Sequence, residues 1–157
     1  MRLTLFTIAA VVALRLFLFY SGNAPEGTDF MLVHFLAIVT VVFFTGHAML
    51  AEDRMARFPD LMRTGFTNAA VYAVLMGLFI WIFYSLIDTE EFPRKIEERV
   101  VALMDAGRPE IEARKGLVAM FTPFNYASIT FFSLLAVGAF NALVIAVIHH
   151  KVLRRLR

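Results

Sequence analysis

The chain has 157 residues, of which 60% are hydrophobic and 14% aromatic, with 17 Phe, and its formal net charge is +2. A soluble domain carries more charge and far less Phe, so this composition indicates an integral membrane protein. The absence of Cys excludes disulfides, thiol catalysis and thiolate metal sites. The small net charge is spread along the chain and gives no sign of nucleic-acid binding.

Four apolar runs follow one another, and we expect each to form a transmembrane helix. They cover residues 3–20, 30–50, 66–87 and 126–148. Each is close to the ~20 residues that a helix rising ~1.5 Å per residue needs to cross a ~30 Å hydrocarbon core. The first run has a rival interpretation as a cleaved signal peptide, but Arg15 lies near its far end and no convincing cleavage site follows it. The sequence therefore predicts an all-α integral membrane protein with one membrane domain, residues 1–157.

Basic residues at the ends of these runs favour a bacterial inner-membrane protein with both termini in the cytoplasm. The cytoplasmic side then holds eight basic residues: Arg2, Arg54, Arg57, Arg63, Lys151, Arg154, Arg155 and Arg157. The loop at residues 21–29 has none, whereas the segment at 89–116 places six on the outer side. The positive-inside rule thus supports this orientation by eight residues to six.

Small residues recur every four positions in the third and fourth runs. They are Ala69, Ala73 and Gly77 in one and Gly138, Ala142 and Ala146 in the other. This spacing keeps them near one helix face, where two backbones can approach closely. We expect the two stripes to pack against each other; a homodimer face and a chance pattern are the alternatives.

The segment TEEFPRKIEERVVALMDAGRPEIEARKG, residues 89–116, is densely charged. Pro93 suits the first turn of a helix and Gly107 suits its end, so we expect an amphipathic helix over 93–106. Its apolar face holds Ile96, Val100, Leu103 and Met104. A second, weaker helical stretch runs from Pro109 to about Met120 and completes a helical loop over 89–120.

Seven acidic residues nearly balance six basic ones in this segment, so it has little reason to seek anionic lipid. We expect a helix hairpin that lies over the extracytoplasmic end of the bundle. Its charged face, Glu97, Glu98, Arg99 and Asp105, is predicted to dock a partner protein.

Candidate ligands for a cofactor are few. His34 and His47 are thirteen residues or ~20 Å apart on one helix and cannot bind one metal together. His47 would need His149 or His150 to form a bis-imidazole haem or metal site. Histidines at the ends of spans are commonly interfacial residues that need no cofactor, and we expect none here.

Two polar residues stand inside the apolar runs. Arg15 is expected to extend its side chain to the headgroups, with an ion pair to Asp29 or to a loop carboxylate as the alternative. Asn141 is expected to hydrogen-bond to a neighbouring helix. Both would line the path if the protein moved a polar solute.

The stretches FPDLMRTGFTNAAVYAVLMGLFIWIFYSLIDTEEF and LLAVGAFNALVIAVIHHKVLRRL, with the amphipathic segment between them, resemble the bacterial membrane family called domain of unknown function 4199. The resemblance is clearest over residues 58–155. It implies four spans, a charged helical insert before the fourth span and a basic C-terminal end. It implies no activity.

Enzyme signatures are absent from the sequence: it has no phosphate-binding loop, no paired intramembrane carboxylates and no His–Glu zinc spacing. The expected function is therefore that of a non-catalytic subunit or scaffold in a larger assembly of membrane proteins, embedded in the lipid bilayer. The first alternative is a small oligomeric transporter or flippase component of cell-envelope lipid or glycan metabolism. The second is a haem-bearing electron-transfer subunit.

Overall fold

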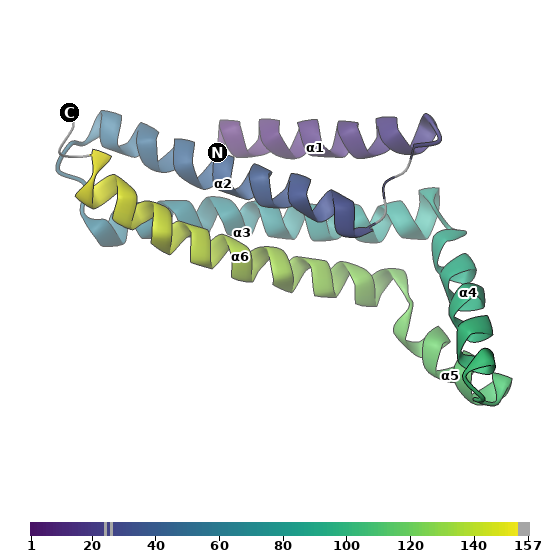
Figure 1. Cartoon of the computed structure of the whole chain (residues 1–157). Coiled ribbons are helices and arrows are strands. Elements are labelled where there is room, and N and C mark those ends of the chain that lie inside the picture. Colours follow the sequence, from purple (N-terminus) through teal and green to yellow (C-terminus); the bar gives the residue numbers. More distant parts are fainter. Residues whose placement is uncertain (24, 26, 154–157) are drawn as a thin grey trace. The chain divides into compact units, whose positions relative to one another are not determined.

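The computed structural model describes residues 1–23, 25 and 27–153, and within that part all regular structure is helical (Figure 1). The elements are α1 (Arg2–Tyr20), α2 (Gly27–Glu52), α3 (Phe58–Ile82), a π-helical turn η1 (Phe83–Ile87), α4 (Glu91–Asp105), α5 (Glu110–Met120) and α6 (Pro123–Lys151). Arg154, Arg155 and Arg157 of the basic C-terminal end lie outside the described residues, as does the side chain of Asp29.

Four stretches are long and apolar enough to cross a membrane, which confirms the four apolar helices predicted from the sequence. They are Arg2–Tyr20, Phe30–Glu52, Phe58–Ile87 and Pro123–Lys151. The chain is thus an all-helical protein with the features of a polytopic membrane protein.

The third apolar helix begins at Phe58, eight residues before the predicted start at residue 66. Pro59 fits the first turn because its fixed φ is helical and an N–H is not needed there. Asp60 lies in the same turn, where a carboxylate interacts favourably with the helix dipole, and accepts a 3.1 Å hydrogen bond from Arg57 Nε. Hydropathy alone missed this turn because it is polar. The last helix likewise starts with a proline, Pro123.

The chain forms two compact units. One comprises Met1–Met76 and Phe131–Arg157, and holds α1, α2 and most of α3 and α6. The other, Gly77–Thr130, holds the end of α3, η1, α4, α5 and the first two turns of α6.

In the first unit, α3 and α6 meet through small residues. A Cβ built on Gly138 would lie 2.6 Å from the Ala69 Cβ, and one built on Gly65 would lie 3.3 Å from the Ala142 Cβ. Ala146 belongs to a buried cluster that includes Leu61. Each step forward by four residues in α6 therefore corresponds to a step back by four in α3, which is the register of two antiparallel helices in close contact.

This contact brings together Ala69 with Gly138, two of the predicted stripe residues. Gly65 was not among the predicted residues, although it lies four positions before Ala69 and so extends the same stripe. Ala73 is buried in the first unit. Gly77 is also buried, but it belongs to the second unit.

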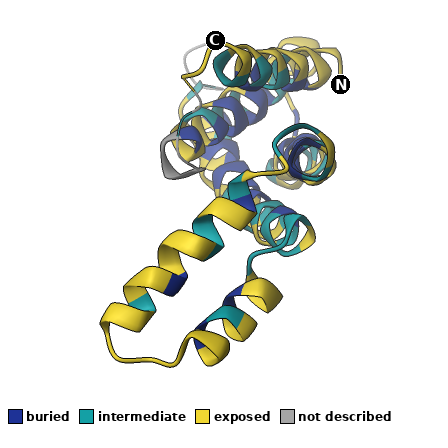
Figure 2. Cartoon of the chain, turned by 90° about the vertical axis from the view of Figure 1, so that its right-hand side faces the viewer, coloured by how far each residue is buried: buried dark blue, intermediate teal, exposed yellow. Residues whose placement is uncertain are grey.

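In the second unit, α4 and α5 pack side by side as a helical hairpin (Figure 2). Val100 of α4 and Ala113 and Leu117 of α5 are buried. The turn depends on Gly107, whose φ of +85° is the left-handed conformation that favours glycine. The N–H groups of Gly107 and Arg108 donate to the carbonyls of Met104 and Leu103 at 2.9 and 3.0 Å, so α4 ends in a Schellman motif.

Three aromatic rings close the base of the hairpin. The Tyr84 ring centroid lies 5.0 Å from that of Phe92 and 5.3 Å from that of Tyr126, and the Phe92 and Tyr126 centroids are 5.8 Å apart. The three residues come from η1, α4 and α6. Offset and edge-to-face contacts of this kind stabilise by about 0.5–1.5 kcal/mol per pair beyond area burial. The cluster holds the start of α4 close to the start of α6.

Candidate functional site

The helices of the hairpin are joined by an ion pair between Glu97 of α4 and Arg114 of α5. Both Nη atoms of Arg114 donate to the Glu97 carboxylate, with an Nη2–Oε2 distance of 2.9 Å, and Nη2 also donates to Glu110 at 3.1 Å. The hydrogen bond from Arg114 lowers the pKa of Glu97, and the same bond raises the pKa of Arg114. A bidentate pair fixes relative orientation as well as distance. Glu97, predicted to dock a partner, is thus engaged within the hairpin.

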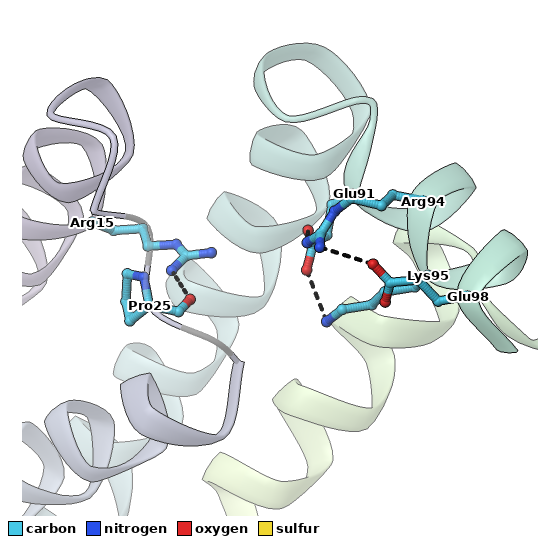
Figure 3. A network of polar contacts seen from close by, with 6 residues as sticks. All are labelled: Arg15, Pro25, Glu91, Arg94, Lys95 and Glu98. Carbon is cyan, nitrogen blue, oxygen red and sulfur yellow. Dashed lines mark hydrogen bonds and ion pairs between the residues drawn. The ribbon is translucent and has the colours of Figure 1, made fainter. Parts of the chain in front are cut away.

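A second group of ion pairs lies along the first turns of α4 (Figure 3). Arg94 donates to Glu91 and, at 3.1 Å, to Glu98, while Lys95 Nζ lies 2.8 Å from Glu91. Partial burial acts to raise the pKa of Glu91, but the hydrogen bonds from Lys95 and Arg94 outweigh it and hold that pKa below its ordinary value. Pairs at this spacing support the helix only weakly, because solvent screens exposed charges. Glu98, the second residue predicted to dock a partner, therefore also has an internal partner.

Arg99 and Asp105, the other two predicted docking residues, are exposed on α4. The Arg99 guanidinium carbon lies 5.7 Å from the centre of the Phe121 ring, a cation–π contact. Across the described part of the chain, no carboxylate forms an ion pair with Arg99. Arg99 therefore keeps a full complement of N–H donors for another group.

Arg99 lies at the edge of a groove of about 410 Å³ between α4 and α5. Its walls are mainly apolar, and Glu98 is the only other charged residue among those that line it. The lining residues are Glu98, Arg99, Ala102, Leu103, Leu117, Met120 and Phe121. The groove is open to the surface and is large enough for part of a small molecule.

The predicted apolar face of α4 is only partly covered. Val100 is buried, Ile96 and Leu103 are half-buried, and Met104 is 45% exposed, so Met104 was wrongly included in the buried face. Met104 lies about 40° of helix rotation from Val100, on the side away from Ile96 and Leu103. Phe92 was missed because it precedes Pro93, where the predicted helix began.

Three large apolar side chains near the turn of the hairpin are exposed. Val101 is 57%, Met104 is 45% and Ile111 is 82% exposed. Single exposed apolar residues are common on soluble surfaces. Here, however, they flank the turn of a segment that is otherwise dominated by charge.

Polar groups inside the apolar helices bond to one another. Thr4 Oγ1 donates to Asn68 Oδ1 at 2.6 Å, and His34 Nδ1 lies 2.9 Å from the Tyr72 hydroxyl. All four side chains are buried. These contacts join α1 to α3 and α2 to α3, where interhelical hydrogen bonds contribute on the order of 1 kcal/mol in membrane proteins.

Arg15 is 7% exposed, and its Nη1 donates to the Pro25 carbonyl at 3.0 Å (Figure 3). Its guanidinium carbon also lies 5.3 Å from the centre of the Phe30 ring. Asn141 is buried, but its Nδ2 donates to the Val137 carbonyl, four residues back in α6, at 2.9 Å. The predicted bond to a neighbouring helix is thus replaced by one within the same helix, because the i−4 carbonyl is within reach of a short amide side chain.

His47 and His149 lie close together, with ring centroids 6.4 Å apart. His149 is fully buried, and its Nδ1 donates to the Ile145 carbonyl at 2.8 Å. The Phe43 ring stacks on His47 and lies 5.0 Å from His149. Among the residues that the structure describes, no group of three or more His, Cys, Asp or Glu side chains gathers to hold a metal ion.

No protein-family model, curated protein or solved structure matches this chain. By length and composition, the four apolar helices are those of a helical membrane protein. Membership of the family called domain of unknown function 4199 stays a prediction.

Proposed function

We propose that this chain is a non-catalytic subunit or scaffold of a larger assembly in the bacterial inner membrane, and that it docks a partner protein through the turn end of the α4–α5 hairpin. The observation that carries the proposal is the exposure of Ile111, at 82%, with Val101 and Met104 also exposed near the same turn. Apolar side chains that a partner covers contribute far more to binding than charges at the rim.

The ion pairs of the hairpin support this surface in a second way. Arg114 holds α5 to α4 through Glu97, so the turn is presented by two fixed helices and little conformational entropy is lost on binding. Glu97 and Glu98 serve inside the hairpin, so the docking surface that we propose lies nearer the turn than the predicted charged face. Asp105, which is exposed in the last turn of α4, remains part of it.

The buried polar groups weigh against solute movement as the main task. These groups are hydrogen-bonded in pairs, Thr4 with Asn68 and His34 with Tyr72. Asn141 bonds to a carbonyl of its own helix. A path for a polar solute would need such groups turned toward a cavity.

We place both termini in the cytoplasm and the hairpin outside, as the basic residues favour. The absence of Cys from the chain allows a direct test with single-cysteine variants. Ile111→Cys should react in intact cells with a membrane-impermeant maleimide, because the side chain is 82% exposed. Labelling only after the cells are opened would place the hairpin in the cytoplasm.

The same variant tests docking. A photoreactive group attached to Cys at position 111 should give one dominant cross-linked protein in native membranes. Val118→Cys is the matched control, since Val118 is 51% exposed on α5 but lies near the other end of that helix. Ile111→Glu should abolish co-purification of the cross-linked protein under mild detergent. Equal cross-linking from both positions, or unchanged co-purification with Ile111→Glu, would refute docking at the turn.

A further inference from the structure

The groove between α4 and α5 is close along the chain to the start of the last apolar helix. Met120 and Phe121 line it, and α6 starts two residues later at Pro123. The 29 residues of this span correspond to about 43 Å of helix, which is the thickness of a bilayer with its headgroup regions. Two residues of chain extend at most about 7 Å, so the groove opens near the first residue of the span.

The charges around the groove leave one cation at its edge. Glu98 is paired with Arg94 at 3.1 Å, and Arg99 pairs with no carboxylate in the described part of the chain. Contact with the Phe121 ring holds the guanidinium against the apolar wall. A planar guanidinium matches the oxygens of a phosphate group, to which it can donate two parallel hydrogen bonds.

We propose that this groove binds one membrane phospholipid, with Arg99 on its phosphate and the glycerol and upper acyl carbons against the apolar walls. This ligand needs both the charge of Arg99 and the apolar walls of the groove. A free phosphate ion would gain nothing from Leu103, Leu117 and Met120, whereas an uncharged lipid would gain nothing from Arg99. The segment has nearly balanced charge, so the attraction arises from one site and not from a polybasic surface.

A bound phospholipid would hold the hairpin to the membrane surface on the side of the groove. The exposed side chains proposed to dock a partner, Val101, Met104 and Ile111, do not line this groove. The lipid site is therefore independent of the docking proposal, and either can fail without the other.

The test uses the full chain in a neutral maltoside detergent, with dioctanoyl-phosphatidylglycerol as the probe and native mass spectrometry as the readout. Wild type should bind one lipid, and Arg99→Gln should weaken binding by about tenfold or more, as expected for a lost charge-assisted contact. Arg108→Gln is the matched control, because it removes an exposed arginine that does not line the groove. Dioctanoylglycerol, which lacks the phosphate, should bind at least tenfold more weakly.

A second variant separates binding from folding. Ala102 is exposed and lines the groove, so Ala102→Trp should fill it and block the lipid while leaving Arg99 in place. Circular dichroism should show unchanged helix content in this variant. The proposal is overturned if Arg99→Gln and Arg108→Gln bind the lipid equally, if Ala102→Trp binds it as wild type does, or if inorganic phosphate competes with it at equal concentration.

Discussion

Replacing Gly138 by Ala tests the contact on which the packing of α3 against α6 depends. The new Cβ would stand 2.6 Å from the Ala69 Cβ, which is about 0.8 Å short of the 3.4 Å at which ordinary contact begins. Neither methyl group has a rotamer that would move it aside. The two backbones must therefore separate, and the neighbouring close approach of Gly65 to Ala142 would loosen with them.

The expected cost follows from two opposing terms. Overpacking a well-packed contact costs about 1–3 kcal/mol. Exchange of Gly for Ala inside a helix gains up to about 1 kcal/mol. We expect a net destabilisation of up to about 2 kcal/mol, measured as the free energy of unfolding in mixed micelles with increasing SDS. Gly138→Leu should destabilise more, because its side chain is larger.

Two further variants make the result specific. Gly116→Ala is the matched control, since no atom lies within 4 Å of a Cβ built there. The double variant Ala69→Gly/Gly138→Ala moves the glycine to the facing helix. The two changes in helix propensity nearly cancel, so stability should return close to that of wild type. If Gly138→Ala is as stable as Gly116→Ala, or if the double variant restores nothing, the close contact does not support the fold.

Two predictions concern the hairpin, and hydrogen exchange of its amides checks both. The pKa of Glu97 is lowered in the folded state by Arg114, so the ion pair contributes stability above the unfolded carboxyl pKa of ~4.3, and this stability is lost as pH falls through the lower folded value. Protection of α5 should therefore fall on acidification below about pH 4. Glu97→Gln should start with lower protection and lose most of this pH dependence. An identical acid profile in the variant would contradict the role of the pair. Val100→Asp should remove protection throughout the hairpin and lower its free energy of unfolding by about 3 kcal/mol or more, because Val100 is only 2% exposed. Val101→Asp should lower it by under about 0.5 kcal/mol, because Val101 is 57% exposed. Similar losses in both variants would refute the assignment of Val100 to the interior of the hairpin.

Much of the architecture could be predicted from the sequence because the bilayer imposes a length and a composition on each span. The four apolar runs and the turn at Gly107 both follow from local chemistry, namely hydrophobicity and the need for a positive φ. Helix starts were less predictable, because Pro59 and Asp60 are polar-looking in a hydropathy scan yet suit a first turn. Hydropathy describes the environment of a segment, whereas the helix start depends on backbone geometry.

The partners of polar side chains could not be predicted in the same way. Thr4 and Asn68 are 64 residues apart, and nothing in either run identifies the other. Glu97 was assigned to an outside partner because sequence alone does not show that Arg114 lies within reach. Glu98 stands four residues after Arg94 in the predicted helix, so its ion pair could have been predicted. Gly65 could also have been predicted from the sequence, because it lies four residues before Ala69 and continues the same spacing.

The aromatic cluster at the base of the hairpin has a consequence for the order of folding. Tyr84 and Tyr126 are separated by 42 positions along the chain, yet their ring centroids lie 5.3 Å apart. If α4 and α5 pair first, through a contact between residues only 17 apart, few flexible residues remain in the loop that must close. The entropy of loop closure is then lost in two small steps. Pairing of α4 with α5 can therefore bring the first turn of α6 to η1 during synthesis, before the rest of α6 has packed.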